Sequence, residues 1–436
     1  MSALNALFDL DRHRTTVTRE IVAGLTTFTT MSYIVVVNPA ILATAGVPEG
    51  PAFTATVVVA VAGCFLMALY ANRPFAIAPY MGENAFIAFT VCKLLGFVWQ
   101  TALAAIFFAG IVFIFLTIFR LRKWLVDGIP TSLRYSFAAG IGLFLTFIGL
   151  NETGLVVLGV PGAPVRAGDL TSHPALVAMF GFILLAALTI RKFPGAIFVG
   201  IVLTALVAFQ TGTAESPKHF VSLPPSLGPI VWRLDFRGAL TWRAFPVVLT
   251  VFIMAFVDTM GTLIGLSARA GFLDDSGRLP QIERPMLVDA VTTTLAPVLG
   301  TTTAGAFVES ATGIEAGGRT GLTALVTGTC FLLTLFFAPF VAAIPAQAYG
   351  PALILVGLFM LTPIARIDFT DYSESIPAFG VIVLMAFTFN IAIGISAGFV
   401  LYVICKSLAG KIRELPGGLW VLAALSLLFF VFYPYG

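Results

Sequence analysis

The segment of residues 301–321 constrains the fold most, because it is polar and yet lies among long apolar runs. It carries two carboxylates, an arginine, several hydroxyl groups and five glycines. It begins with three threonines, which suit an extended backbone, and from Glu309 onward its pattern favours a helix. The hydrocarbon core of a bilayer accepts no unpaired backbone group, so a broken segment there must be buried in protein or line a cavity. We therefore expect the centre of function at Glu309. The alternatives are a solvated loop between two spans, or a buried carboxylate that accepts backbone N–H groups and serves only packing.

The composition indicates a polytopic membrane protein. Of the 436 residues, 59% are hydrophobic and 10% are charged, whereas soluble domains have about 25% charged residues. Spans of about 20 residues would use most of this length and leave no room for a separate soluble domain. The net charge of +3 indicates no nucleic-acid partner. Scattered histidines and single cysteines form no metal or disulfide pattern, so we expect no metal and no other cofactor. The first twenty residues lack a long apolar core, so we expect no cleaved signal peptide.

The apolar runs predict an all-α polytopic membrane protein with about fourteen transmembrane spans. The expected spans are residues 20–37, 54–71, 76–95, 101–119, 133–150, 174–190, 195–210, 246–267, 286–299, 301–321, 321–343, 349–364, 376–389 and 391–407. They divide into seven plus seven, and an odd number per half inverts the second half relative to the first. The third and tenth spans are interrupted by polar residues at the same place in each half. Broken helices in matching positions point to a transport site.

Two parts of this count stay open. The runs 376–389 and 391–407 touch, so one long kinked helix is the competing interpretation. The last apolar run, 419–433, is short for a full crossing, and it forms either an interfacial helix or a tilted extra span. Basic residues follow most even-numbered spans, which places the N-terminus in the cytoplasm by the positive-inside rule. The basic connection 211–245 is the exception to that pattern.

Three carboxylates within the spans are candidates for substrate and proton binding, because ionisable residues inside a membrane are functional candidates by default. The two oxygens of Glu309 suit the adjacent N–H groups of a planar heterocycle, and Ser310 and Thr303 offer further hydrogen-bond donors. Asp258 lies in an apolar run, where a bond to nearby threonines is the structural alternative. Glu83 lies in the break of the third span, where a clamp on the unwound backbone is the alternative.

Other polar groups receive mainly structural interpretations. Glu315 and Arg319 are spaced i,i+4, which predicts an ion pair between them. Asp289 and Asn38 fall near span ends, where they are expected to cap helices or form local turns. Beside Glu83, Asn84 and Phe86 are candidate substrate contacts. A packing role is the alternative for Phe86 in a chain with 41 phenylalanines.

Four segments of the chain carry a family resemblance. They are residues 24–42, 81–89, 256–265 and 308–322, the last reading VESATGIEAGGRTGL. They resemble the signature segments of the azaguanine-resistance-type purine permeases, within the nucleobase–cation symporter 2 group, also called nucleobase–ascorbate transporters. The resemblance covers nearly the whole chain. It implies a fourteen-span 7+7 inverted repeat, with a core domain of spans 1–4 and 8–11 and a gate domain of spans 5–7 and 12–14.

The predicted spans also order the domains along the chain. Residues 1–210 would form the first repeat and residues 246–407 the second, inverted repeat. An extracellular or periplasmic connection, 211–245, would join them, and an apolar tail, 408–436, would follow.

Motif positions carry the family's site residues onto this chain. Asp258 and Glu309 match the family's binding carboxylates on spans 8 and 10, and Thr262 falls where relatives for uracil carry a histidine. Glu83 departs from the pattern, because purine permeases of this branch commonly have an apolar residue there. The expected substrate contacts are Glu309, Asp258, Glu83, Asn84, Ala85, Phe86, Thr262, Ser310, Thr303 and Phe28. The expected proton-coupling groups are Glu309, Asp258 and Glu83.

The implied function is secondary active import of a purine nucleobase (adenine, guanine or hypoxanthine) by proton symport in the cell membrane. The core would move against the gate in alternating access, protons are favoured over sodium, and gate domains would form a homodimer. The alternative is a carrier of the same fold for another nucleobase-like substrate or for a small anion, although two or three carboxylates disfavour an anion. A channel would need no inverted repeat with two broken spans. A membrane enzyme would need a nucleophile–base pair or a metal set, which the sparse histidines and cysteines do not supply.

Overall fold

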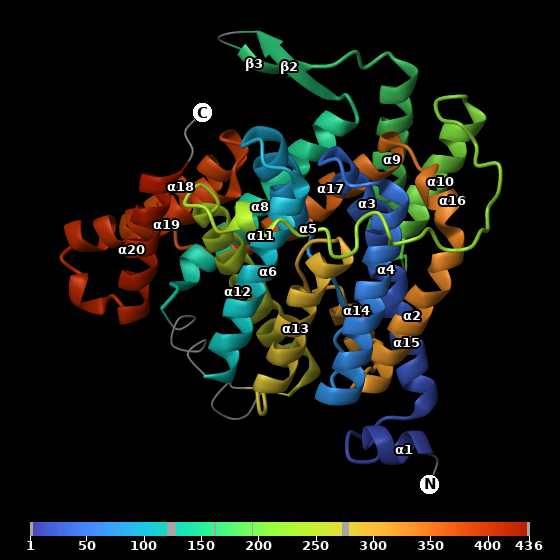
Figure 1. Ribbon diagram of the computed structural model, residues 1–436, viewed down its shortest axis with the longest axis horizontal. Helices are drawn as coiled ribbons and strands as arrows, with labels where there is room; N and C mark the ends of the chain where they lie inside the picture. Colours follow the sequence, from blue (N-terminus) through green and yellow to red (C-terminus); the bar gives the residue numbers. More distant parts are fainter. Residues whose placement is uncertain (1–2, 120–127, 161–162, 194, 273–278, 434–436) are drawn as a thin grey trace. The chain divides into compact units, whose positions relative to one another are not determined.

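The computed structural model describes residues 3–119, 128–160, 163–193, 195–272 and 279–433, and these residues are mostly helical (Figure 1). Within this described part, nine helical segments are long and apolar enough to cross a membrane. They are residues 17–44, 49–71, 99–118, 131–152, 173–190, 245–270, 321–342, 346–366 and 391–408. The expectation of an all-α polytopic protein is confirmed by this arrangement.

The chain divides into two compact units, each assembled from distant parts of the sequence. The first unit comprises Met1–Leu121, Pro217–Leu240 and Val251–Ala342. The second comprises Arg122–Ser216, Thr241–Thr250 and Ala343–Gly436. Segments from both halves of the sequence therefore contribute to each unit.

The first unit is built on long helices that enclose two interrupted segments. Its helices are α1 (Ala3–Phe8), α2 (Val17–Met31), α3 (Ile34–Thr44), α4 (Glu49–Leu66), η1 (Met67–Ala71), α6 (Trp99–Ile118), α11 (Phe236–Ala239), most of α12 (Phe245–Ala270), α13 (Glu283–Leu299), α15 (Gly321–Thr334), η3 (Leu335–Phe337) and α16 (Ala338–Ala342). Helices in the core of this unit pack closely where one of them carries a glycine. A Cβ on Gly110 of α6 would lie 3.0 Å from the Cα of Thr294 on α13, so only glycine lets these two helices touch backbone to backbone.

The first interrupted segment consists of β1 (Ile77–Pro79), α5 (Met81–Ala85) and η2 (Phe86–Leu94). The second consists of β4 (Ala304–Ala306) and α14 (Ser310–Glu315). These are the two breaks that the sequence predicts in spans 3 and 10, and both are confirmed as short extended runs followed by helices. A π-helical stretch such as η2 is rare and occurs often at functional sites.

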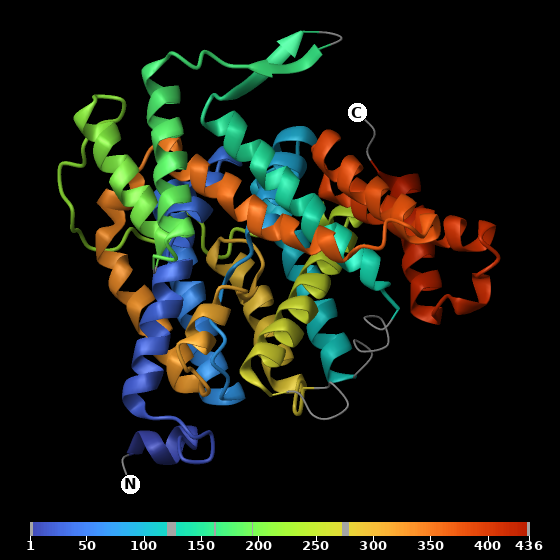
Figure 2. The same cartoon turned by 180° about the vertical axis from the view of Figure 1, so that it is seen from behind.

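The second unit is a helical bundle with one small hairpin. Its elements are α8 (Thr131–Glu152), β2 (Val156–Val160), β3 (Ala163–Ala167), α9 (His173–Ile190), α10 (Ala196–Gln210), α17 (Ala346–Leu361), η4 (Thr362–Arg366), α18 (Tyr372–Phe387), α19 (Ile391–Leu408), η5 (Ile412–Glu414) and α20 (Gly417–Phe432). Helices α8 and α17 pack along one another (Figure 2). A Cβ on Gly142 of α8 would lie 2.5 Å from the carbonyl oxygen of Gly357 on α17, so this contact also requires glycine.

Two details of the predicted spans need correction, and the prediction of separate spans at 376–389 and 391–407 is confirmed. The first span covers Val17–Thr44 and is interrupted between α2 and α3 near Tyr33, so it does not end at residue 37. The loop before α9 contains the β2–β3 hairpin, which the sequence did not predict. Residues 388–390 separate α18 from α19, and the two helices pack on each other, so a single kinked helix is excluded. The tail run is helix α20, which packs on α19; whether it crosses a membrane stays a prediction.

A buried ion pair joins α18 and α19 in the second unit. The Nζ of Lys406 lies 2.5 Å from a carboxylate oxygen of Glu374, and the side chain of Lys406 is only 7% exposed. Glu374 also accepts hydrogen bonds from Tyr402 at 2.6 Å and from Ser132 of α8 at 2.5 Å. One carboxylate therefore connects three helices.

We predict that Glu374→Ala destabilises the second unit by about 3 kcal/mol, because it leaves the charge of Lys406 buried without a partner. Unfolding of the purified protein in detergent measures this loss. Lys411→Ala is the matched control, since it removes only the surface pair with Asp371, and its unfolding should match that of the unaltered protein. Equal stability of Glu374→Ala and the unaltered protein would contradict the structural role of the pair.

Candidate functional site

The two breaks in the first unit pair with each other. Strands β1 and β4 are antiparallel, with Ile77 opposite Ala306 and Pro79 opposite Ala304. The ladder continues beyond β1, where the backbone N–H of Tyr80 donates to the carbonyl oxygen of Thr303 at 2.9 Å. Each broken segment thus satisfies the backbone groups of the other, which is what an extended run at membrane depth requires.

Asp289 of α13 binds the backbone of strand β4 in this pair. Its side chain is fully buried and accepts the backbone N–H of Ala306 at 2.8 Å. It also accepts the hydroxyl groups of Thr259 and, at 3.4 Å, Tyr80. The sequence places Asp289 near a span end as a cap, and this is wrong: α13 begins six residues earlier, and the carboxylate holds strand β4 in place.

Asn38 forms a second set of contacts around the breaks. Its side-chain amide donates to Thr56 of α4 at 2.7 Å and to Thr301, just before β4, at 3.0 Å. Its backbone carbonyl accepts from the side chain of Asn84 on α5 at 3.4 Å. Asn38 lies inside α3, so its predicted role as a turn residue is also wrong. It connects the two interrupted segments to the surrounding helices.

Glu83 and Asp258 are brought together although they are far apart in the sequence. Glu83 lies in the first turn of α5 and is fully buried. Within the described part of the chain, neither of its carboxylate oxygens has a hydrogen-bond partner. Its strongest charged neighbour is the carboxyl group of Asp258 on α12. Two carboxyl groups in this arrangement repel each other when both are charged, and a single proton between them converts the repulsion into a hydrogen bond.

Glu309 lies at the start of α14, directly after the break. Its side chain is half-buried, and the hydroxyl group of Tyr33 donates to its Oε1 at 2.8 Å. Helix α14 packs on α2, where Thr30 and Thr312 share a hydrogen bond of 2.9 Å. The neighbouring Val308 is 63% exposed. Tyr33 thus holds one oxygen of Glu309, and the adjacent side chain of Val308 is exposed.

Small and polar residues along one side of α12 are also partly or fully exposed. Asp258 and Thr262 are half-buried, and Gly261 and Gly265 are exposed. A Cβ built on either glycine would meet no atom within 4 Å. These positions are three to four residues apart and so lie on one face of the helix. The structure therefore presents Asp258 and Thr262 on an open face of α12.

The remaining predicted site residues lie in more enclosed surroundings. Ala85 and Phe86 are buried in the core, and Phe86 is 1% exposed. Thr303 is fully buried, and its hydroxyl group has no partner among the described residues. Ser310 is also buried, and its hydroxyl oxygen accepts the backbone N–H of Ala76 at 2.9 Å. Phe28 of α2 is half-buried and packs edge to face on Phe331 at 5.2 Å.

Sequence reasoning missed three residues that shape this region. Tyr33 donates a hydrogen bond to Glu309, and Tyr80 donates one to Asp289. Each tyrosine lies in an apolar run, and this pattern could have indicated the contact, because a buried tyrosine hydroxyl group usually has a hydrogen-bond partner. Glu20 of α2 is fully buried and accepts the backbone N–H groups of Arg319 at 2.9 Å and Thr320 at 3.2 Å, at the start of α15.

The predicted pair of Glu315 and Arg319 is wrong. Glu315 instead forms an ion pair of 2.6 Å with Arg269 at the end of α12. The Nη1 of Arg319 donates to the carbonyl oxygens of Ile314 and Gly318, both at 2.7 Å. The short helix α14 ends at residue 315, so the i,i+4 spacing does not persist to Arg319.

Comparison with known proteins shows the family of this chain. The Permease family, Xan_ur_permease, matches residues 18–401. The adenine permease AdeQ of Escherichia coli is 41% identical over 97% of this chain and 95% of its own length. The guanine/hypoxanthine permease PbuO of Bacillus subtilis is 40% identical over 98% of this chain and 99% of its own length.

A solved structure shares the fold. The transmembrane domain of the cyanobacterial bicarbonate transporter BicA superposes with a TM-score of 0.65 at 18% identity, over 87% of this chain and 96% of that domain. At this identity the likeness shows the fold alone. That fold is the 7+7 inverted repeat that the sequence predicts, with the two breaks at matching places in the two halves.

We predict that Asp289→Ala destabilises the first unit by about 2–3 kcal/mol, because it leaves the buried N–H of Ala306 without its acceptor. Asp289→Asn keeps an acceptor oxygen at the same place and should lose much less. Thermal unfolding of both purified variants measures the difference. If the two variants unfold alike, Asp289 does not act through the backbone of β4.

Proposed function

We propose that this chain, which belongs to the Permease family, imports purine nucleobases by proton symport. The relatives AdeQ and PbuO, named for adenine and for guanine and hypoxanthine, match almost its full length. The observation that carries the proposal is the half-buried carboxylate of Glu309 at a paired break of the first unit. Among the described residues, one of its two oxygens is held by a neighbouring side chain, the hydroxyl group of Tyr33.

Glu309 is the main substrate ligand in this proposal. Adjacent ring N–H groups of a purine fit the two oxygens of one carboxylate. Tyr33 fixes the carboxylate through Oε1, which aims the group before the substrate arrives. Hydrogen bonds to a charged acceptor contribute about 1.5–3 kcal/mol each. The exposed side chain of Val308 beside it supplies an apolar contact for a flat ring.

The open face of α12 supplies the second part of the substrate site. Asp258 and Thr262 lie one turn apart on that face, and the exposed Gly261 and Gly265 leave space beside them. A planar ring can approach the backbone of α12 there without meeting a side chain. We assign Asp258 and Thr262 to the polar edge of the substrate, and Asn84, Ala85, Phe86, Thr303, Ser310 and Phe28 to support of the site.

Glu83 and Asp258 form the proton site. Glu83 is buried and meets no hydrogen-bond donor in the described part of the chain, and Asp258 is its strongest charged neighbour. The pair is stable with one shared proton and repels itself when that proton leaves. Because Asp258 also lies on the open face of α12, substrate and proton act on the same residue. That shared residue is a physical basis for coupling their movements.

The two compact units correspond to the parts of an alternating-access carrier. We assign the first unit, which holds every predicted site residue, to the core domain, and the second to the gate domain. We further propose that the protein lies in the cell membrane with its N-terminus in the cytoplasm. It would form a dimer through contacts between gate domains. An anion carrier remains the second candidate on fold alone, but three carboxylates in the site region disfavour an anionic substrate.

We predict that Glu309→Gln weakens purine binding by roughly tenfold to a few hundredfold, because about 1.4 kcal/mol corresponds to one decade of affinity. Calorimetry of purified protein with adenine, guanine and hypoxanthine measures this change. Glu315→Gln is the matched control, since it removes a carboxylate from the same helix that pairs only with the exposed Arg269. Unchanged affinity in a folded Glu309→Gln variant would remove Glu309 from the site.

We further predict that Glu83→Gln uncouples uptake from the proton gradient. Uptake of radiolabelled purine by the unaltered protein should rise as external pH falls and should collapse with a protonophore. In Glu83→Gln both responses should be lost, while purine binding to the purified variant persists. Glu49→Gln, at the start of α4, is the control and should behave as the unaltered protein does. Uptake that follows sodium and ignores the protonophore would overturn proton symport.

A further inference from the structure

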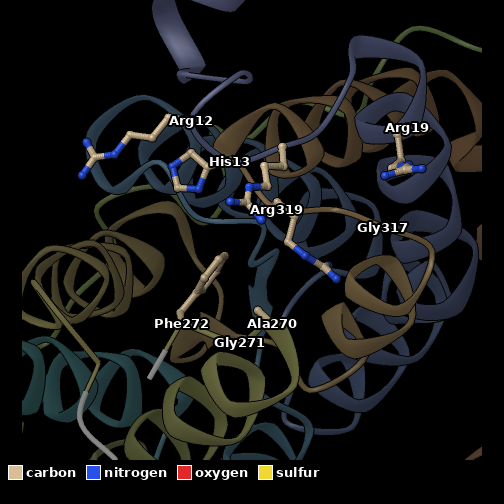
Figure 3. Close-up of a pocket in the computed structure, with 9 residues that line it drawn as sticks. Arg12, His13, Arg19, Ala270, Gly271, Phe272, Gly317 and Arg319 are labelled. Carbon is tan, nitrogen blue, oxygen red and sulfur yellow. The ribbon is translucent and has the colours of Figure 1, made fainter. Parts of the chain in front are cut away.

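A basic pocket lies at one end of the first unit, apart from the paired breaks (Figure 3). It forms where α2 begins, where α12 ends, and where the chain turns after α14, and its volume is about 570 Å³. The residues that define its chemistry are Arg12, His13, Arg14, Arg19, Phe272 and Arg319. None of the expected functional residues lines it, and the proposed transport reaction does not use it.

Four arginines and one histidine are among the described residues that line the pocket, and no acidic residue is among them. Within the described part of the chain, Arg12, Arg14, Arg19 and Arg319 form no ion pair with an acidic side chain. Asp9 lies near His13, and Asp11 accepts the side-chain amide of Asn5 at 2.5 Å. Two further acidic side chains are engaged elsewhere. Glu315 pairs with Arg269, and Glu20 accepts backbone N–H groups at the start of α15. Among the described residues, the four arginines that line this cavity are therefore not paired with a carboxylate.

The walls of the pocket are shaped by specific contacts. Arg319 is held by two hydrogen bonds of its Nη1 to backbone carbonyls. Gly317 has a φ of +109°, and a Cβ there would lie 2.7 Å from the Cδ of Arg19, so the arginine stem rests on a position that only glycine suits. The guanidinium carbon of Arg73 lies 4.9 Å from the centre of the Phe272 ring. The centre of the His13 ring lies 6.4 Å from the same point. Figure 3 shows the labelled arginines and His13 spread around the space above Phe272.

We propose that this pocket binds a phosphate-bearing anion. Guanidinium groups present forked N–H donors that match phosphate oxygens, and several of them together neutralise a doubly charged group. The cavity lies at the ends of two spanning segments, Val17–Thr44 and Phe245–Ala270, which is the level of lipid headgroups. The phosphate of an anionic lipid and a soluble phosphate share the chemistry that this pocket recognises.

The test uses the full-length protein purified in detergent. The probes are inorganic phosphate and dihexanoyl phosphatidic acid, with sodium chloride at equal ionic strength as the blank, and the readout is the melting temperature. Arg12→Gln/Arg14→Gln/Arg19→Gln removes three pocket charges. The control variant, Arg166→Gln/Arg191→Gln/Arg413→Gln, removes three exposed charges of the second unit. A saturable rise in melting temperature is expected in the unaltered and control proteins, with its midpoint shifted at least tenfold in the pocket variant.

The two probes separate the two sources. Saturation by the lipid alone assigns the pocket to a headgroup, whereas equal saturation by both probes assigns it to a free phosphate, and either result supports the proposal. A rise that fails to saturate, or that is equal in the pocket and control variants, overturns it.

A second readout follows His13 directly. Burial and the nearby Arg73 and Arg12 guanidinium groups lower the pKa of His13, and a bound anion should raise that pKa again. Nuclear magnetic resonance of the imidazole, with His173 and His219 replaced by glutamine, measures this shift. A pKa of His13 that stays constant at saturating probe places the anion elsewhere and overturns the proposal.

Discussion

The antiparallel pairing of β1 and β4 is the constraint on which the rest of the first unit depends. A helix interrupted at membrane depth exposes backbone N–H and C=O groups that lipid cannot satisfy. Here each interruption supplies the partner of the other, with Ala78 opposite Gly305 at the centre of the ladder. The pairing only works if both breaks lie at the same depth. An inverted repeat provides that condition, because it places equivalent segments of two halves face to face.

The carboxylates of the first unit divide by what their oxygens contact. Asp289 and Glu20 accept backbone N–H groups and act as fixed acceptors for β4 and for the start of α15. Glu309 has one hydroxyl partner, and Glu83 has none in the described residues. A buried carboxylate with hydrogen-bond donors for its oxygens stabilises the fold. A buried carboxylate without such donors lowers the stability of the fold, so packing does not account for its presence. The incompletely satisfied groups are therefore the ones to which we assign function.

The fold was predictable where the signal is local in the sequence. Apolar runs gave the spans, and polar residues inside two of them marked the breaks, including Glu83 and Glu309. Contacts between distant segments were not predictable. Tyr33 meets Glu309 across 276 positions, and Asp289 binds a backbone amide that no side-chain pattern marks. Asp289 and Asn38 were misassigned because α13 begins earlier and α3 ends later than hydropathy indicates. The pairing of Glu315 with Arg269 likewise depends on where α12 ends.

One turn of α12 links the proposed proton site to the proposed substrate site. Adjacent helical residues point about 100° apart, so Asp258 and Thr259 face different surroundings. Asp258 lies on the open face beside Glu83, whereas Thr259 is fully buried and donates to Asp289. Asp289 in turn holds Ala306, three residues before Glu309. A change of charge at Asp258 that moves this turn of α12 therefore acts on the strand that positions Glu309. The buried hydrogen bonds of Thr259 and Ala306 to Asp289 thus connect this turn of α12 with the strand that precedes Glu309.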